Sequence, residues 1–166
     1  MTDERGGTTR PTHVGYIDRT RAYYAALGHP RPYQWARHRD APFAPLPRPL
    51  AECTVAVVTT AYPWIEAGPR PPKEVYSEPV EPVPERMYTA DLAWDKETTH
   101  TDDVATFLPL VQLDRAARDG RIGALATRFH GVPTAYSRRR SSEEDAPEIL
   151  ARLRADRADV VMLVPL

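Results

Sequence analysis

Proline is the feature that most limits how this chain can fold. Of the 166 residues, 18 are proline, more than double the share of ~5% that is usual. Six prolines lie between residues 30 and 49, and seven lie between residues 63 and 84. Each one removes a backbone N–H and restricts the residue before it to extended geometry. We therefore expect irregular, proline-rich arms, with the hydrophobic core built from the segments between them.

The charges of the chain are almost balanced, with 22 Lys and Arg against 23 Asp and Glu. Binding of nucleic acid through bulk charge needs a basic surface, so we expect no nucleic-acid partner. The longest apolar runs, Val55–Val58 and Val160–Val164, are much shorter than the ~20 residues of a membrane helix. We expect no membrane span. The first residues show no apolar stretch behind a basic start, which predicts a cytoplasmic protein.

A single cysteine, Cys53, is present, so an internal disulfide and a cysteine metal cluster are excluded. Cys53 opens an apolar run and has no basic neighbour, which favours a buried structural thiol over a nucleophile. No spacing typical of a metal site or a nucleotide-binding loop occurs in the sequence. We predict no metal site, and no cofactor is indicated by the residues themselves.

The chain divides by pattern into three parts. Residues 1–13 are small and polar, and we interpret them as a flexible tail. Residues 14–50 combine a helix, predicted from Val14 to Leu27 and ended by Gly28, with the first proline-rich arm. Aromatic residues in that arm suggest that it packs onto a surface. Residues 51–166 are predicted to form an α/β domain, either complete or incomplete.

Two apolar runs predict the strands of this domain. Cys53–Thr60 and Val160–Val164 lack strict alternation, which is typical of strands covered on both faces in a parallel sheet. A helix is predicted from Pro109 to about Asp119, with Gly120 after its end. Another helix, capped by Ser142 or Asp145 and with Pro147 in its first turn, is expected to bury Ile149, Leu150 and Leu153. We therefore predict an α/β fold with a mostly parallel sheet and flanking helices.

The remaining segments are less regular. Met87–Trp94 is predicted as a strand, Ile122–Ala126 as either a short strand or a helical turn, and Tyr62–Pro84 and Phe129–Tyr136 as loops. The basic run Arg138–Arg140 and the acidic run Glu143–Asp145 are predicted as a solvated surface loop.

Ligands of open α/β sheets bind beyond the carboxyl ends of the strands. Thr59 and Thr60 end the first strand, and we predict that they bind substrate, although threonine is also common where a strand ends for structural reasons. The second strand ends next to Leu166. We expect the end of the second strand to lie at the same edge of the sheet as Thr59 and Thr60. Two interpretations are open: the strand stops just before a catalytic loop, or it is an ordinary strand end.

Two histidines and one arginine are candidates for chemistry. His100 precedes Asp102 and Asp103, an arrangement suited to a general base or a metal ligand, but a polar surface loop explains it better. Arg128 can hold a carboxylate with two hydrogen bonds, and His130 can move protons near pH 7. A loop with this composition is equally compatible with a packing or surface role.

Several segments taken together resemble one family. In chain order they are Val14–Tyr24, Val55–Thr60, Phe107–Leu110, Gly120–Leu125, Arg128–Gly131 and Ala158–Pro165. This ordered set resembles the selenoprotein B family of glycine, sarcosine and betaine reductases, which includes D-proline reductase relatives. The resemblance covers most of the chain from Val14, and residues 63–84 fit it least.

The resemblance implies an oxidoreductase subunit that cleaves a carbon–nitrogen bond of a small amino-acid-like substrate. It also implies other subunits of a reductase complex as partners, in a hetero- or homo-oligomer, one of them carrying a pyruvoyl group. In the family, the strand similar to Val160–Pro165 leads into a selenocysteine or cysteine followed by a second cysteine. The present sequence stops at Leu166, so the resemblance places the redox residue after it. A non-catalytic interaction subunit and a small-molecule-binding domain are the alternatives.

Overall fold

The computed structural model describes residues 15–29, 31, 39–41, 44–66, 72–92 and 95–166. The chain divides into two compact units, residues 1–43 and 44–166. The predicted tail, residues 1–13, lies outside the described residues, as does most of the first arm.

The first unit contributes one described element, the helix α1 (Tyr16–Ala26). Gly28 follows it with a φ of +79°, the left-handed conformation that glycine adopts easily after a helix. The predicted helix is therefore confirmed. Its apolar residues are not buried, however, and Tyr16, Tyr23 and Leu27 are all more than half exposed.

The second unit is built on a central strand, β1 (Thr54–Thr59). Parallel to it run β7 (Val160–Val164) on one side, and β5 (Ala124–Leu125) and β6 (Arg128–Gly131) on the other. The strand β3 (Tyr76–Pro79) pairs with β6 in the antiparallel direction. The sheet is thus mostly parallel, and the predicted fold class, α/β, is confirmed.

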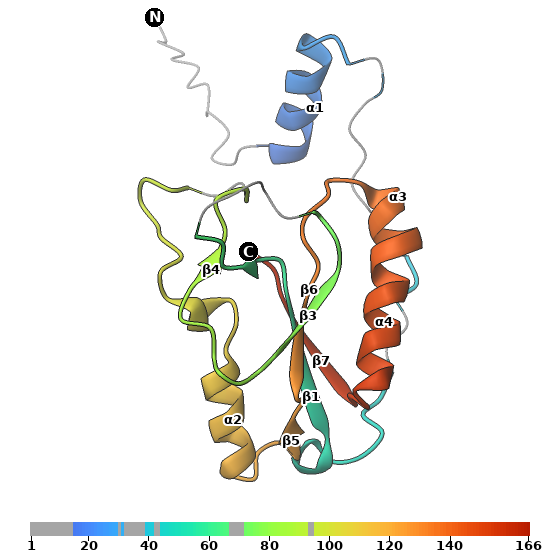
Figure 1. Cartoon of the computed structure of the whole chain (residues 1–166). Coiled ribbons are helices and arrows are strands. Elements are labelled where there is room, and N and C mark those ends of the chain that lie inside the picture. Colours follow the sequence, from blue (N-terminus) through green and yellow to red (C-terminus); the bar gives the residue numbers. More distant parts are fainter. Residues whose placement is uncertain (1–14, 30, 32–38, 42–43, 67–71, 93–94) are drawn as a thin grey trace, which may run out of the picture. The chain divides into compact units, whose positions relative to one another are not determined.

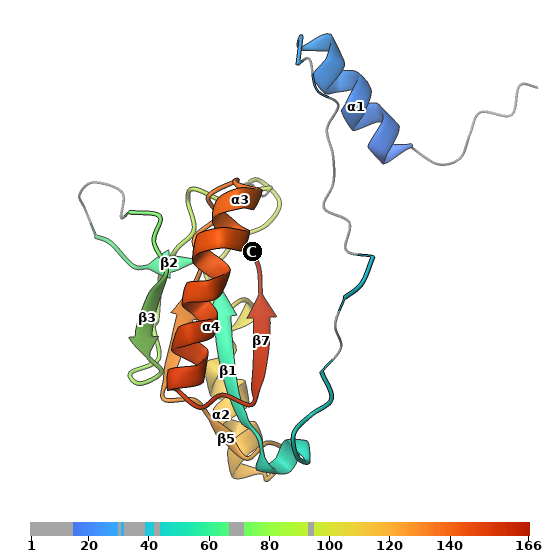
Figure 2. The ribbon, with the colours of Figure 1, turned by 90° about the vertical axis from the view of Figure 1, so that its right-hand side faces the viewer.

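Helices cover both faces of this sheet (Figures 1 and 2). The helix α2 (Leu110–Arg118) packs Leu110 and Leu113 on one face, against Val55, Val57 and Phe129. On the other face, α4 (Ala146–Ala155) packs Ile149 and Leu153 against Ala56 and Val58. This two-sided burial explains why β1 is a continuous apolar run.

Short elements complete the unit. They are the 3-10 helices η1 (Leu50–Glu52) and η2 (Val104–Thr106), the strands β2 (Tyr62–Pro63) and β4 (Met87–Tyr88), the helix α3 (Arg138–Arg140) and the short π-helix η3 (Ser141–Asp145). The antiparallel pair of β2 and β4 forms a small second sheet. Cys53 is fully buried between η1 and β1, as predicted.

The structure corrects the predicted burial of the last strand. β7 pairs with β1 alone among the described strands and therefore lies at the edge of the sheet. Val161, Met162 and Leu163 are exposed, and Leu163 retains 69% of its accessible surface. An apolar run shows that a strand is hydrophobic, but its position in the sheet depends on pairing.

Several predicted loops are also regular structure. Residues 62–84, predicted as irregular, contain β2 and β3, and Phe129 lies on β6 instead of in a loop. Of the predicted strand Met87–Trp94, Met87–Tyr88 is strand and residues 89–92 are not, because pairing with β2 covers only two residues. Residues 93 and 94 lie outside the described residues. The segment with two readings, Ile122–Ala126, contains the short strand β5.

The last helix starts earlier than predicted. Ser137 caps it by accepting a hydrogen bond from the backbone N–H of Arg140 (3.2 Å), so the predicted caps, Ser142 and Asp145, lie inside the helical segment. The charged runs are therefore helical and not a loop. Pro147 lies in the first turn of α4, as expected. Leu150 was predicted to face inward but is 47% exposed, because α4 buries only the stripe through Ile149 and Leu153.

Candidate functional site

The carboxyl ends of three parallel strands meet at one edge of the sheet. Thr59 of β1 lies opposite Gly131 of β6 and opposite Val164 of β7. Beyond β7, the backbone N–H of Leu166 donates a hydrogen bond to Oγ1 of Thr60 (2.9 Å). Residues 59–60, 131 and 164–166 therefore form what we term the carboxyl edge, the part of an open α/β sheet where ligands bind.

Both predicted substrate-binding threonines lie at this edge, but their hydroxyls already have partners within the chain. Thr59 is 1% exposed, and its Oγ1 lies 3.4 Å from the backbone nitrogen of Ala61, which donates to it. Thr60 is half-buried, and its Oγ1 accepts the hydrogen bond from the backbone N–H of Leu166. Their present role is to shape the edge and to fasten β7 to β1.

Tyr76 of β3 covers one side of the carboxyl edge. Its hydroxyl donates a hydrogen bond to the carbonyl oxygen of Ala61, and its ring lies over Gly131. A Cβ atom at Gly131 would lie 1.9 Å from Cε1 of that ring, so only glycine fits there. Burial raises the pKa of Tyr76, and the negative charge of Glu78 raises it further. The phenol is therefore neutral and acts as a donor.

Beneath this edge, on the face covered by α4, lies a polar network centred on His130. The imidazole is completely buried, and its Nδ1 is 2.8 Å from Oγ of Ser77 on β3. Its Nε2 is 3.0 Å from Oδ2 of Asp156, directly after α4, although the N–H has no acceptor in line with it. The network thus connects two strands with the end of a helix.

Two arginines complete the network. Arg128 donates from Nε (3.1 Å) and Nη2 (2.6 Å) to Asp156, and these hydrogen bonds raise the pKa of its guanidinium. Arg152 of α4 donates from Nη1 to Oγ of Ser77 (2.9 Å). Because Ser77 accepts from Arg152, its own proton is directed to His130.

The charge state of His130 follows from this environment. Burial, which penalises the imidazolium, lowers the pKa of His130. The carboxylate of Asp156 opposes that shift, and the positive charges of Arg128 and Arg152 add to it. The ring is therefore neutral near pH 7, with Nδ1 accepting from Ser77 and the proton on Nε2 facing Asp156.

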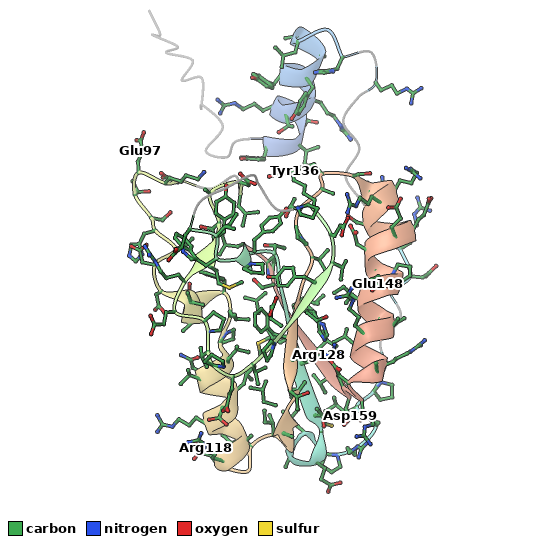
Figure 3. The ribbon with its side chains drawn as sticks, in the orientation of Figure 1. Glu97, Arg118, Arg128, Tyr136, Glu148 and Asp159 are labelled. Atoms are coloured by element: carbon green, nitrogen blue, oxygen red, sulfur yellow. The ribbon has the colours of Figure 1, made fainter. Side chains whose placement is uncertain are left out.

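The predicted site residues fall into three separate places. Arg128 lies three residues before Gly131, so it is roughly 10 Å from the carboxyl edge along the strand. Its guanidinium binds Asp156 of the same chain. Figure 3 labels Arg128 and Asp159 toward one end of the sheet and Tyr136 toward the other. His130 shares the α4 face with Arg128, whereas Thr59 points to the α2 face with Val55 and Val57.

His100 belongs to a different surface. It lies in the exposed segment before η2, and its Nδ1 is 3.7 Å from Oδ2 of Asp102, with both side chains more than 70% exposed. Among the described residues, no group of three His, Cys, Asp or Glu side chains is placed to hold a metal ion.

A second set of contacts fixes the loops around the carboxyl edge. Lys73 donates from Nζ to the carbonyl oxygen of Thr134 (2.7 Å) and lies over the ring of Tyr136. Arg140, in the first turn of the last helix, donates to the carbonyl oxygen of Lys73 and pairs with the buried Asp145 (3.4 Å).

Ser77, Asp156 and Tyr76 were missed in the sequence analysis. They belong to segments that looked irregular or to a helix end, and none stands in a recognisable motif. Only the pairing of β3 with β6, which sets Ser77 opposite His130, brings the network together.

Comparison of the chain with family models, with curated proteins and with solved structures gives no match. Within the described residues, none of the helices has the length and apolar character needed to cross a bilayer.

Proposed function

We propose that this chain is the N-terminal part of a subunit of a glycine, sarcosine, betaine or D-proline reductase-like oxidoreductase. In this proposal a selenocysteine or cysteine follows Leu166 and performs the reduction. The proposal starts from the ordered resemblance of six segments. The observation that supports it best is the 2.9 Å hydrogen bond from Leu166 to Thr60, because a residue that follows Leu166 would emerge at the carboxyl edge.

The chemistry requires an easily ionised selenol or thiol, since the ionised form is the nucleophile. Cleavage of the carbon–nitrogen bond consumes two electrons and two protons, and the selenol or thiol pair that supplies the electrons is oxidised. Cys53 does not meet this need, because it is fully buried beside η1. We also propose a cytoplasmic location, where thiol pairs are kept reduced. The pyruvoyl group belongs to a partner subunit in this proposal, so no residue of this chain is assigned to it.

The nucleotide sequence after the Leu166 codon provides the first test. A cysteine codon, or an in-frame UGA followed by further coding sequence with a cysteine, supports the proposal. A UAA or UAG stop at that position contradicts it.

An activity assay provides the second test. The chain extended past Leu166 is combined with the partner subunits, and dithiol-dependent reduction of glycine, sarcosine, betaine and D-proline is measured. We expect turnover of one of these substrates by the extended chain and none by residues 1–166. Equal turnover by both chains would show that the redox residue lies elsewhere, and no turnover by the extended chain would contradict the reductase function.

A non-catalytic interaction subunit is the second candidate, and the exposed edge of β7 favours it. Val161, Met162 and Leu163 leave an apolar edge strand open to solvent, a feature that proteins normally protect. Stable co-purification of the extended chain with the reductase subunits, without any contribution to their turnover, would distinguish this role from catalysis.

A further inference from the structure

A tryptophan and an arginine come together beside the small second sheet. Trp64 directly follows β2, and Arg86 directly precedes β4, so the antiparallel pairing of these strands brings the two side chains to the same place. Cζ of Arg86 lies 4.4 Å from the centroid of the Trp64 ring. This is a cation–π contact, in which the ring attracts the positive guanidinium.

Arg86 has no acidic partner within the described part of the chain. In this it differs from Arg128 and Arg152, each of which pairs with a carboxylate. Among the described residues, the ring of Trp64 is therefore the contact that compensates its positive charge, and we take its N–H donors to be available to an anion.

A hollow of about 530 Å³ opens beside this pair. Its lining includes Trp64, Arg86, Tyr88, Thr89, Lys96 and Thr101. This volume is within the range of small-molecule sites, which is roughly 300–1,000 Å³. Among the described residues of the lining, Arg86 and Lys96 are cations and Asp102 is the acid, a balance that favours a negatively charged ligand. We call it the Trp64 hollow.

The lining also offers a hydroxyl donor. Oγ1 of Thr89 and Oγ1 of Thr101 are 2.6 Å apart, and Thr89 is 7% exposed. One hydroxyl proton is used between the two oxygens, and the other remains for an acceptor in the hollow. Met87, which is buried, and the ring of Tyr88 add apolar surface.

We propose that the Trp64 hollow binds a small organic carboxylate with a flat, apolar body. Arg86 receives the carboxylate through two parallel hydrogen bonds, the geometry that a guanidinium fork favours. The free threonine hydroxyl donates to the same anionic group, and the apolar body lies against Trp64 and Tyr88. The site is independent of the reductase function, because it uses none of the residues of the carboxyl edge or the His130 network.

Binding of benzoate to the whole chain, measured by calorimetric titration, tests this proposal. Benzamide has the same shape without the charge, and phenylphosphonate has a bulkier anion with the same ring. We expect benzoate to bind at least about tenfold more tightly than benzamide, since a hydrogen bond to a charged group is worth about that factor. Equal affinities, or no benzoate binding, would overturn the proposal. Tighter binding of phenylphosphonate than of benzoate would overturn the choice of a carboxylate.

Three variants locate the site. Arg86→Gln should weaken benzoate binding by about tenfold and remove the preference over benzamide. Trp64→Leu should weaken benzoate and benzamide alike. Arg154→Gln, which changes an exposed arginine of α4 outside the hollow, is the matched control and should bind as the unchanged chain does. Benzoate binding that survives Arg86→Gln unchanged, in a variant with an unaltered circular dichroism spectrum, would show that the hollow is not the site.

Discussion

The imidazole of His130 and the carboxylate of Asp156 lie 3.0 Å apart, with the imidazole fully buried and the aspartate side chain 8% exposed. His130 belongs to β6 and Asp156 to the end of α4, so this contact joins the sheet to the helix that covers it. Ser77 and Arg152 extend the connection to β3. Buried networks of this kind stabilise a fold when their members are satisfied, and they are costly when one member is removed.

The free energy of unfolding should depend on the protonation of His130. Burial lowers the pKa of His130 in the folded chain below the ordinary value of 6.5, so the unfolded chain takes up the proton first as the pH falls. The contribution of neutral His130 to the free energy of unfolding is therefore fully present above pH 6.5. It is lost as the pH falls from that value to the pKa of His130 in the folded chain. We expect urea denaturation to give a lower free energy of unfolding at about pH 5.5 than at about pH 7.5.

Two variants separate this effect from other titrations. His130→Gln should lose most of the pH dependence in that range, while His100→Gln should keep it, because His100 is exposed. Retention of the full dependence in His130→Gln would show that another group causes it.

Removal of the Ser77 hydroxyl should destabilise the fold. Ser77→Ala leaves Nδ1 of His130 without a donor and Nη1 of Arg152 without its acceptor, and an unsatisfied buried polar atom costs about 1–3 kcal/mol. Urea denaturation at neutral pH measures this loss. Ser142→Ala, at an exposed helical position, is the control and should change stability by less than about 0.5 kcal/mol. Equal effects of the two variants would mean that the network contributes nothing.

A methyl group at Gly131 should be poorly tolerated. The Cβ of Gly131→Ala would overlap the ring of Tyr76, and overpacking of this kind costs about 1–3 kcal/mol. The clash depends on the ring, so the same change should cost at least about 1 kcal/mol less in a Tyr76→Leu background. Thermal or urea denaturation of the four chains measures this coupling. If the losses in the free energy of unfolding caused by Gly131→Ala and Tyr76→Leu simply add in the double variant, the two residues are not in contact.

The open edge of β7 should promote self-association. Leu163→Lys places a charge on the most exposed residue of this strand, and lysine on an edge strand opposes pairing with another strand. We expect less association of Leu163→Lys than of the unchanged chain in sedimentation velocity at high protein concentration. Val111→Lys changes an exposed residue of α2 and serves as the control. If both variants associate as the unchanged chain does, the edge of β7 has no part in the process.

Local features of the sequence were sufficient to predict the main elements. The apolar run around Val57 predicts a buried strand because both of its faces are covered, and Gly28 and Gly120, each with a positive φ, mark the ends of two helices. The same reasoning could not place β7 at the edge, because Val160–Val164 has the composition of a central strand. Its neighbours are set by the topology of the sheet.

The polar site was harder to predict than the fold. His130 and Arg128 stood out as residues, but their partners, Ser77 and Asp156, come from distant segments. From the sequence, residues 129–136 are predicted as a loop, so nothing indicates that His130 and Gly131 lie on a strand beside Ser77 and Tyr76. In the structure, Arg128, His130 and Gly131 each make a contact that depends on their place on β6. Arg128 donates to Asp156, Nδ1 of His130 contacts Oγ of Ser77, and Gly131 admits the ring of Tyr76.

The contacts of Lys73 and Arg140 constrain how the carboxyl edge can move. Lys73 is tied to Thr134, and Arg140 is tied to both Lys73 and Asp145. These contacts link the segment that enters β3, the segment that leaves β6 and the first turn of the last helix, so a shift of one segment would strain or break its contacts with the others. A ligand that needed this edge to open wider would therefore have to disrupt the contacts of Lys73 or Arg140.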